Sequence, residues 1–207
     1  KEVRAMTEDA GLVCSSYGSY YRLACAGTES TAFAPVLDSA IALGVPTIRV
    51  WAGNRGSAEA DEEWWSAVID DALITTNVAA EHGITIALEF HSHTLTDTVA
   101  SALRLLKAVD HAHFRTYWQP PAGATVGDCL DGLRQVKPWL TNLHVHYLEG
   151  TKNVGLDEGT DAWKAFLNEA DAEDTERYAL LEFVPDNSPE SFLHEAEVLK
   201  RLLPGQA

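Results

Sequence analysis

Four short runs of the sequence combine strand-forming residues with a terminal side chain that could ligate a metal ion. Each ligand stands at or just beyond the last apolar residues of its run. Parallel strands of one sheet end on the same edge, so the four side chains would converge on a single site. The runs are IALEFH (86–91), TYWQP (116–120), NLHVHY (142–147) and ALLEFV (179–184), which carry Glu89, Gln119, His144 or His146, and Glu182.

The donor atoms of this set are mostly hard oxygen atoms. Two carboxylates, an amide oxygen and an imidazole suit Mn²⁺, Mg²⁺ or Co²⁺ better than zinc, because structural zinc favours thiolates in a closed tetrahedron. A divalent ion that is open on one side can chelate the hydroxyl and carbonyl oxygens of a sugar and stabilise the enediolate that forms when the adjacent C–H loses its proton. Glu89 and Glu182 are the expected acid and base that move this proton.

Aromatic and imidazole side chains stand at or just past the same strand ends. Aromatic faces pack against the C–H faces of sugar rings, and imidazoles can hydrogen-bond to hydroxyls. Packing in the interior is the alternative for Trp51 and Trp118. Arg49 lies within an apolar strand and needs an acidic neighbour or a substrate anion as partner. The residues expected to bind substrate are Tyr20, Trp51, His91, His93 and Trp118.

Strand and helix patterns alternate along the whole chain. Strands joined by helices of roughly 10–20 residues form right-handed βαβ units, so the pattern predicts one α/β domain over residues 1–207 with a parallel sheet. The expected strands are 12–16, 46–53, 85–90, 114–119, 140–148 and 178–184, with a loop after the first. The expected helices are 1–10, 30–44, 61–83, 96–109, 126–140, 161–171 and 188–203.

The number of strands favours an incomplete barrel. Six strand–helix units are visible, whereas a closed (β/α)8 barrel has eight and typically about 250 residues. The chain also begins in the last turns of a helix, so we expect two βα units, roughly 50 residues, to precede Lys1 in the intact protein. A doubly wound open sheet is the alternative, but no predicted strand is followed by a GxGxxG loop.

The composition limits the class of partner. A formal charge of −16, with 15 Lys and Arg, argues against nucleic acid, which requires a basic face. No apolar run reaches the roughly 18–20 residues of a membrane span. The three cysteines, Cys14, Cys25 and Cys129, are too few and too scattered for a disulfide framework and indicate a cytoplasmic protein. We expect a small sugar or polyol as partner, no nucleic acid and no membrane, and a homo-oligomer is compatible with the sequence.

Segments spread over nearly the whole chain resemble the xylose-isomerase-like TIM-barrel superfamily of sugar phosphate isomerases and epimerases. The resemblance implies a TIM barrel whose first two βα units precede this chain. It also implies a metal set of Glu89, Gln119, His144 or His146, and Glu182, with the two glutamates as acid–base pair. The segments are GLVCSSYGSYYRLA, PTIRVWAG, HGITIALEFHSHTLTDT, FRTYWQPPAG, LTNLHVHY and ALLEFVPDNSPESF.

Three positions depart from the pattern of that family. Gln119 stands where the family has an aspartate, which removes one negative charge but keeps an oxygen that can coordinate. Ala122 stands where a histidine is common, three residues after that aspartate. The His-x-x-Glu of the ketose epimerases is matched by His146 and Glu149, but Lys152 replaces the arginine that follows.

The reaction that we expect first is that of a metal-dependent isomerase or epimerase, which acts on a keto-sugar or polyol derivative through an enediolate. A dehydratase of the inosose or dehydroshikimate type starts from the same proton abstraction but loses water. A non-catalytic sugar-binding barrel is the third alternative, and Gln119 is the residue that favours it. A DNA-repair endonuclease of the same superfamily is disfavoured by the acidic charge and the small number of candidate ligands.

Overall fold

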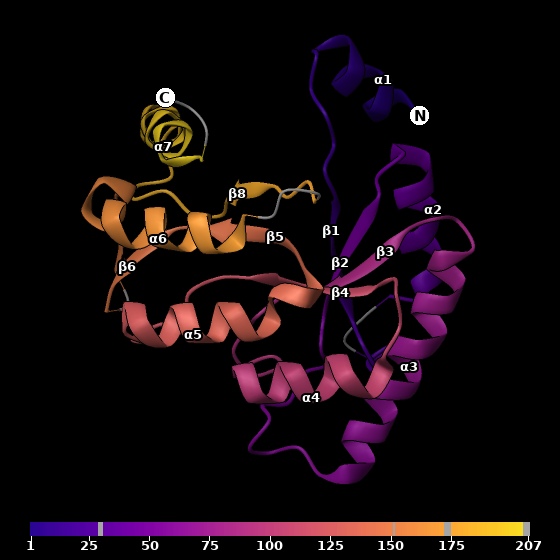
Figure 1. The fold of residues 1–207 in the computed structure, drawn as a ribbon. Coiled ribbons are helices and arrows are strands. Elements are labelled where there is room, and N and C mark those ends of the chain that lie inside the picture. Colours follow the sequence, from indigo (N-terminus) through magenta and orange to yellow (C-terminus); the bar gives the residue numbers. More distant parts are fainter. Residues whose placement is uncertain (29–30, 151, 172–174, 205–207) are drawn as a thin grey trace. The chain divides into compact units, whose positions relative to one another are not determined.

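The structure is a computed structural model that describes residues 1–28, 31–150, 152–171 and 175–204. The chain divides into two compact units, Lys1–Tyr117 and Trp118–Ala207. Strands and helices alternate in both units, as the sequence pattern predicts (Figure 1). Within the described ranges, no helix is long and apolar enough to cross a membrane.

The first unit is built on a parallel sheet in the order β1-β2-β3-β4. Its register aligns Ile48 of β2 with Ile86 of β3 and Ile86 with Phe114 of β4. All three side chains are fully buried, so they form one apolar row across the sheet. The elements are α1 (Glu2–Asp9), β1 (Tyr17–Arg22), α2 (Phe33–Leu43), β2 (Thr47–Trp51), α3 (Glu62–Ala80), β3 (Thr85–Leu88), α4 (Val99–Val109) and β4 (Phe114–Trp118), whose last residue opens the second unit.

The helices of this unit begin and end at residues suited to those positions. Asp61 caps α3 by accepting a hydrogen bond from the Trp64 N–H at 2.8 Å, and Thr98 caps α4 by accepting one from the Ser101 N–H at 3.1 Å. Such caps satisfy N–H groups that have no partner within the helix. Gly44 ends α2 in the left-handed region, with a φ of 74°, where a residue without Cβ is favoured.

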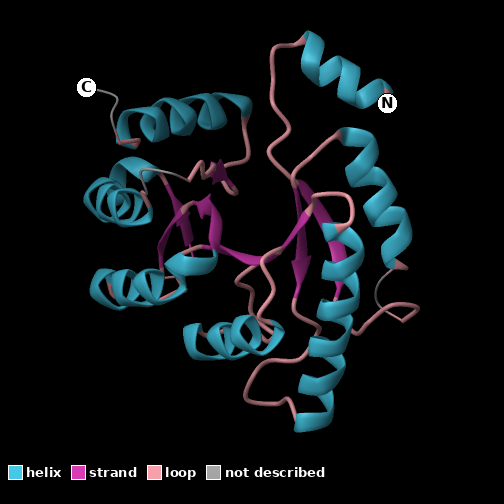
Figure 2. Ribbon diagram, turned by 45° about the vertical axis from the view of Figure 1, so that its right-hand side comes forward, coloured by secondary structure: helices cyan, strands magenta, loops and turns pink. Residues whose placement is uncertain are grey.

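The second unit holds the parallel strands β5 and β8 and an antiparallel hairpin formed by β6 and β7. Helices α5, α6 and α7 pack in sequence order, α5 against α6 and α6 against α7. The strands of the unit, in magenta, and its helices, in cyan, can be followed in Figure 2. The elements are α5 (Val126–Val136), η1 (Lys137–Trp139), β5 (Leu140–Val145), β6 (Tyr147–Glu149), β7 (Lys152–Val154), η2 (Leu156–Gly159), α6 (Thr160–Ala170), β8 (Ala179–Leu181) and α7 (Pro189–Leu202).

A buried tryptophan links the helices of the second unit to the end of β5. Trp163 of α6 is fully buried, and its indole N–H donates to the carbonyl oxygen of His146 at 2.9 Å. The same ring contacts Phe166 edge-on, with centroids 5.5 Å apart. Because a buried indole N–H needs an acceptor, this hydrogen bond fixes the backbone at His146.

The predicted strand at 12–16 is wrong. The first strand is β1, at 17–22, where the sequence predicts a loop. Leu12 and Val13 are instead 64% and 78% exposed, so their apolar character does not reflect a core position. Within β1 the buried side chains alternate at Ser19 and Tyr21, and the Ser19 hydroxyl donates to the Arg49 carbonyl oxygen at 2.6 Å. A serine satisfied by the neighbouring strand occupies the core face, and this hides the alternation in the sequence.

The remaining boundaries differ by a few residues from those predicted. The run 140–148 is two strands rather than one, because β5 ends at Val145 and β6 begins at Tyr147. The last strand is confined to Ala179–Leu181, so Glu182 follows it directly. The predicted start of the second helix at Ser30 lies outside the described residues.

The position of the Tyr147 ring, next in sequence to His146, depends on a glycine. A Cβ built on Gly159 would overlap the Tyr147 ring. We therefore expect Gly159→Ala to lower the free energy of unfolding by about 1–3 kcal/mol, because the half-buried ring has to move to make room for the added methyl group. Urea unfolding followed by circular dichroism measures this change.

The matched control is Gly127→Ala in α5. The nearest atom to a Cβ there is the Thr125 hydroxyl oxygen at 3.8 Å, which is an ordinary contact. Alanine also favours the helix by up to about 1 kcal/mol. Equal destabilisation by the two substitutions would show that the contact between Gly159 and Tyr147 is not a constraint.

Candidate functional site

In the first unit, the carboxylate of Glu89 is held by two donors from β2. Glu89 follows β3 directly and is 3% exposed. Its Oε2 accepts a hydrogen bond from the Trp51 indole N–H at 2.5 Å and lies 3.0 Å from the Arg49 guanidinium. Its backbone N–H donates to the Val50 carbonyl oxygen at 3.1 Å, which extends the β2–β3 pairing by one residue. Arg49 thus pairs with an acidic neighbour, which is one of the two partners that the sequence leaves open.

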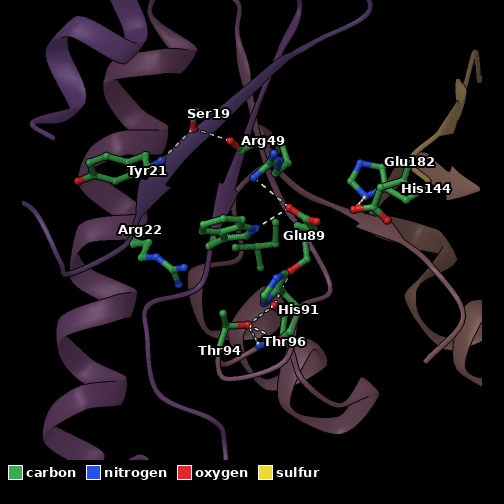
Figure 3. A network of polar contacts seen from close by, with 12 residues as sticks. Ser19, Tyr21, Arg22, Arg49, Glu89, His91, Thr94, Thr96, His144 and Glu182 are labelled. Carbon is green, nitrogen blue, oxygen red and sulfur yellow. Dashed lines mark hydrogen bonds and ion pairs between the residues drawn. The ribbon is translucent and has the colours of Figure 1, made fainter. Parts of the chain in front are cut away.

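The loop after β3 is fixed by two buried threonines (Figure 3). The Thr96 hydroxyl donates to the Glu89 carbonyl oxygen at 2.5 Å and lies 2.9 Å from the Thr94 hydroxyl. Thr94 in turn donates to the His91 carbonyl oxygen at 2.8 Å. These bonds place the backbone on both sides of Phe90, so the Glu89 and His91 side chains start from a fixed position.

Trp51 is the centre of an aromatic and cationic group. Its ring centroid lies 5.4 Å from that of Tyr20 and 5.1 Å from that of His91. The guanidinium carbons of Arg22 and Arg49 lie 4.2 and 5.1 Å from the same centroid, as cation–π contacts. Figure 3 shows the side chains of Arg22, from β1, and Arg49, from β2. Two positively charged guanidinium groups therefore contact one partly exposed aromatic ring, in a chain that is acidic as a whole.

In the second unit, four of the predicted ligand residues meet. The Oε1 of Gln119 and the Nδ1 of His144 are 3.1 Å apart. The Glu182 carboxylate lies between the two imidazoles, with Oε1 3.4 Å from Nδ1 of His144 and Oε2 3.2 Å from Nδ1 of His146. Figure 3 shows Glu182 beside His144. The Glu182 N–H donates to the Val145 carbonyl oxygen at 3.2 Å, so the β5–β8 pairing sets the position of the carboxylate.

The unmet hydrogen-bonding capacity of this group suits a cation. Among the described residues, the buried atoms His146 Nδ1 and Glu182 Oε2 face each other at 3.2 Å and have no other hydrogen-bond partner. Buried polar atoms are nearly always paired, and an unpaired one can mark the place where an ion binds. Ligand atoms bound at about 2.1 Å to one ion lie about 3.0–3.4 Å apart. The separations among these side chains fall in that range, so the residues fit a divalent ion.

Glu182 is ionised over the whole physiological pH range. Burial raises the pKa of its carboxyl, but the imidazoles of His144 and His146, both within 3.4 Å of it, favour the charged form and lower the pKa to about 2. An ionised carboxylate is the form that binds a cation.

The predicted substrate-binding residues differ widely in their exposure to solvent. Tyr20 is 75% exposed, and His93 is exposed with a φ of 59°. Trp118 is fully buried and packs edge-on against Phe166, with ring centroids 5.2 Å apart. Trp118 therefore occupies the packing position that the sequence leaves open as its alternative.

Sequence reasoning missed Arg22 and the two threonines. Arg22 is the last residue of β1, a strand that the sequence analysis places five residues too early. Its position at a strand end is the signal that a correct strand boundary would have given. Thr94 and Thr96 act through their hydroxyls on backbone oxygens, and nothing in the sequence distinguishes them from other loop threonines.

Comparison with known proteins places this chain among barrel proteins. The family model described as xylose isomerase-like TIM barrel matches residues 1–202. A curated relative, the 3-dehydroshikimate dehydratase of Bacillus anthracis, is 26% identical over 175 residues, which are 73% of this chain. The match spans 61% of the length of that relative.

Solved structures confirm the predicted α/β barrel fold class. The structure of a probable 3-DHS dehydratase from Bacillus anthracis matches with a TM-score of 0.77 and 21% identity, over 96% of this chain and 80% of that chain. An L-ribulose 3-epimerase matches with a TM-score of 0.64 and 16% identity, over 95% of this chain and 70% of that chain. Proteins of this fold therefore include both a dehydratase and an epimerase.

Two further structures of the same fold contain metal ions. A xylose isomerase-like protein from Mycobacterium smegmatis, in complex with magnesium, matches with a TM-score of 0.60 and 14% identity over 98% of this chain and 78% of that chain. The IOLI protein with a bound zinc atom matches with a TM-score of 0.60 and 15% identity over 83% of this chain and 67% of that chain. At these identities the likeness shows the fold alone.

The lowered pKa of Glu182 makes the stability of the metal-free protein depend on pH. A carboxyl whose pKa falls from 4.5 to about 2 on folding contributes stability above pH 4.5, and this contribution is lost as the pH falls toward 2. Between pH 5 and pH 3 we expect the free energy of unfolding to drop by about 2 kcal/mol more in the wild type than in Glu182→Gln. Urea unfolding at the two pH values measures the difference. Equal drops in both proteins would contradict the lowered pKa.

Proposed function

Because this chain belongs to the xylose isomerase-like TIM barrel family, we propose that it is a divalent-metal-dependent enzyme that removes a proton next to a carbonyl group of a small polyhydroxy substrate. Of the outcomes open to that chemistry, we propose the elimination of water, as in a dehydratase of the dehydroshikimate type. The family match over residues 1–202 supports the further proposal that residues 1–207 belong to one barrel domain.

The observation that carries the proposal is the group formed by Gln119, His144, His146 and Glu182. In it a buried imidazole nitrogen and a buried carboxylate oxygen face each other and have no other hydrogen-bond partner among the described residues. We propose that Glu89 completes the metal set. In a TIM barrel the carboxyl ends of the strands form one face, and Glu89 follows β3 as Glu182 follows β8. Mg²⁺, Mn²⁺ or Co²⁺ suits these oxygen-rich ligands best, and the zinc of one relative keeps that ion among the candidates.

The ion would polarise the carbonyl oxygen of the substrate and so acidify the adjacent C–H. Glu89 and Glu182 supply the proton transfers. One carboxylate accepts the proton from carbon, the C–O bond to a neighbouring hydroxyl breaks, and that oxygen leaves as water with the proton that the carboxyl group has just accepted. Arg49 and Trp51 hold Glu89 in one orientation, and the paired strands β5 and β8 hold Glu182.

Elimination is favoured over epimerisation by the curated relative and by the charge around Trp51. The 26% identical relative is a 3-dehydroshikimate dehydratase, and dehydroshikimate carries a carboxylate. A guanidinium binds a carboxylate through paired N–H donors. Arg22, which stacks on Trp51, is in our proposal the group that binds it. Epimerisation of a keto-sugar is the second candidate, which the L-ribulose 3-epimerase of the same fold supports.

The direct test is an assay of the metal-loaded protein with 3-dehydroshikimate and a panel of inososes and ketoses. We expect loss of one water from 3-dehydroshikimate, detected by mass spectrometry, and exchange of a substrate C–H with solvent deuterium, detected by NMR. Glu182→Gln should lower both rates by about 100-fold or more, because proton transfer then lacks one of its groups. Isomer formation without water loss would support the epimerase. The absence of all three processes with Mg²⁺, Mn²⁺ or Co²⁺ would refute the proposal.

The role of Arg22 is tested with Arg22→Met, which keeps the apolar stem over Trp51 but removes the charge. We expect KM for 3-dehydroshikimate to rise about tenfold with kcat nearly unchanged, because the contact is made equally in the ground and transition states. The matched control is Arg55→Met, since exposed Arg55 stacks on Trp64 at 4.5 Å in the same way. Similar KM values for the two variants would remove Arg22 from substrate binding.

A further inference from the structure

The last two residues of β1 carry side chains on opposite faces of the sheet, because side chains alternate along a strand. Tyr21 is 2% exposed, and its ring contacts Phe33 of α2 edge-on, with centroids 5.2 Å apart. Arg22 lies on the other face. Its guanidinium carbon is 4.2 Å from the centroid of the Trp51 ring, and its Nη1 donates to the Gly53 carbonyl oxygen at 3.3 Å. Figure 3 shows Tyr21 and Arg22 leaving β1 in different directions.

One carboxylate of α3 binds the chain on both sides of Arg22. The Oδ2 of Asp71 accepts a hydrogen bond from the Tyr21 hydroxyl and another from the Ala24 N–H, both at 2.8 Å. Burial and the hydrogen bond to Asp71 raise the pKa of Tyr21, so the phenol stays protonated and remains the donor. Hydrogen bonds to a carboxylate are stronger than those between neutral groups. Asp71 therefore joins the end of β1 firmly to α3.

The backbone after Arg22 depends on such contacts. Ala24 has a φ of 60°, in the left-handed region that residues with a Cβ seldom adopt. A residue keeps this conformation only where its surroundings hold it. Between the two contacts with Asp71, the Leu23 N–H donates to the Trp51 carbonyl oxygen at 2.9 Å. The backbone around Arg22 is thus fixed to α3 on one side of the sheet and to β2 within it.

We propose that Asp71 is a positioning residue for Arg22: it holds the end of β1 so that the guanidinium stays over Trp51, where it binds the carboxylate of the substrate. The proposal rests on the proposed function for the role of Arg22. Asp71 itself lies on the helix side of the sheet and acts through the backbone of β1. A guanidinium that is already held in place loses less conformational freedom when it binds an anion. Loss of Asp71 should therefore weaken substrate binding and leave the chemical step intact.

The kinetic test uses the metal-loaded full chain with 3-dehydroshikimate as substrate. Asp71→Ala removes the acceptor, and we expect KM to rise about three- to tenfold with kcat nearly unchanged. Asp71→Asn keeps an oxygen that can accept both hydrogen bonds, so its KM should stay within about twofold of the wild-type value. Asp70→Ala is the matched control, because Asp70 is the preceding residue of α3 and is exposed. Its KM should equal that of the wild type.

A double-mutant cycle separates the positioning of Arg22 from general damage to the fold. In Arg22→Met the group that Asp71 positions is already lost, so Asp71→Ala should add no further rise in KM. An equal rise in both backgrounds would overturn the proposal, as would a rise in Asp71→Asn as large as that in Asp71→Ala. Tyr21→Phe removes one of the two hydrogen bonds and keeps the ring. It should give a smaller rise, and it takes the place of Asp71→Ala in the cycle if that variant does not fold.

A second measurement needs neither substrate nor metal. The chain has six tryptophans, and the indole N–H signal of Trp51 in ¹H–¹⁵N NMR spectra is identified by its absence in Trp51→Phe. Loss of the guanidinium in Arg22→Met should shift this signal, since the charge lies against the ring. Asp71→Ala should shift it in the same direction, and Asp70→Ala should not shift it.

An unshifted Trp51 signal in folded Asp71→Ala would contradict the positioning role. The same signal keeps this proposal distinct from the proposed function. If the wild type does not convert 3-dehydroshikimate, the proposed function fails, whereas the Trp51 signal still decides whether Asp71 positions Arg22.

Discussion

The carboxylate of Glu182 between two imidazoles is the interaction on which the chemistry of the second unit depends. Its two oxygens face different rings, and the attraction of those rings outweighs the cost of burial, so that the pKa of the carboxyl falls to about 2. The position of this carboxylate is set by backbone pairing, because the Glu182 N–H donates to Val145 next to the β5–β8 ladder. A charge in this place is stable only with positive or N–H partners around it. The ionised state of Glu182 therefore depends both on the strand pairing that positions it and on the two histidines that contact it.

The carboxylate of Glu89 in the first unit is also removed from water, and different partners stabilise its charge. Its carboxylate is buried, and it is stabilised by the permanent charge of Arg49 and the indole N–H of Trp51 on a single oxygen. An arginine stays charged at every working pH, whereas an imidazole changes its charge near neutral pH. The environment of Glu89 is therefore set by a permanent charge, and that of Glu182 by two imidazoles. Two carboxylates in such unequal surroundings are suited to different steps of a proton transfer.

The sequence predicts the alternation of strands and helices, and most boundaries to within a few residues, because apolar periodicity and helix caps are local signals. It also predicts that Gln119, His144, His146 and Glu182 gather, since strand-end positions follow from the strand assignments. The prediction from sequence fails where a contact between strands decides which residues are buried or where a strand ends. Ser19 is a core residue of β1 because its hydroxyl donates a hydrogen bond to the Arg49 carbonyl oxygen. The hairpin of β6 and β7 begins where the chain leaves the sheet after Val145. Arg22 was missed for the same reason, because its role depends on a ring that another strand supplies.

The exchange of an acidic ligand for Gln119 need not mean that the site lost its chemistry. An abolished site would be expected to lose its other polar members as well, because well-packed apolar residues are often at least as stable in the interior as a buried ion pair. Here His146 is buried and Glu182 is half-buried, and among the described residues their facing atoms have no hydrogen-bond partner beyond each other. Glu89 keeps its own arginine. One fewer negative charge would leave a bound divalent ion with more of its positive charge, and such an ion polarises a carbonyl oxygen more strongly although it is held less tightly. A weaker but more electrophilic metal site is a coherent alternative to a non-catalytic barrel, and it agrees with the polar groups that the chain still maintains in its interior.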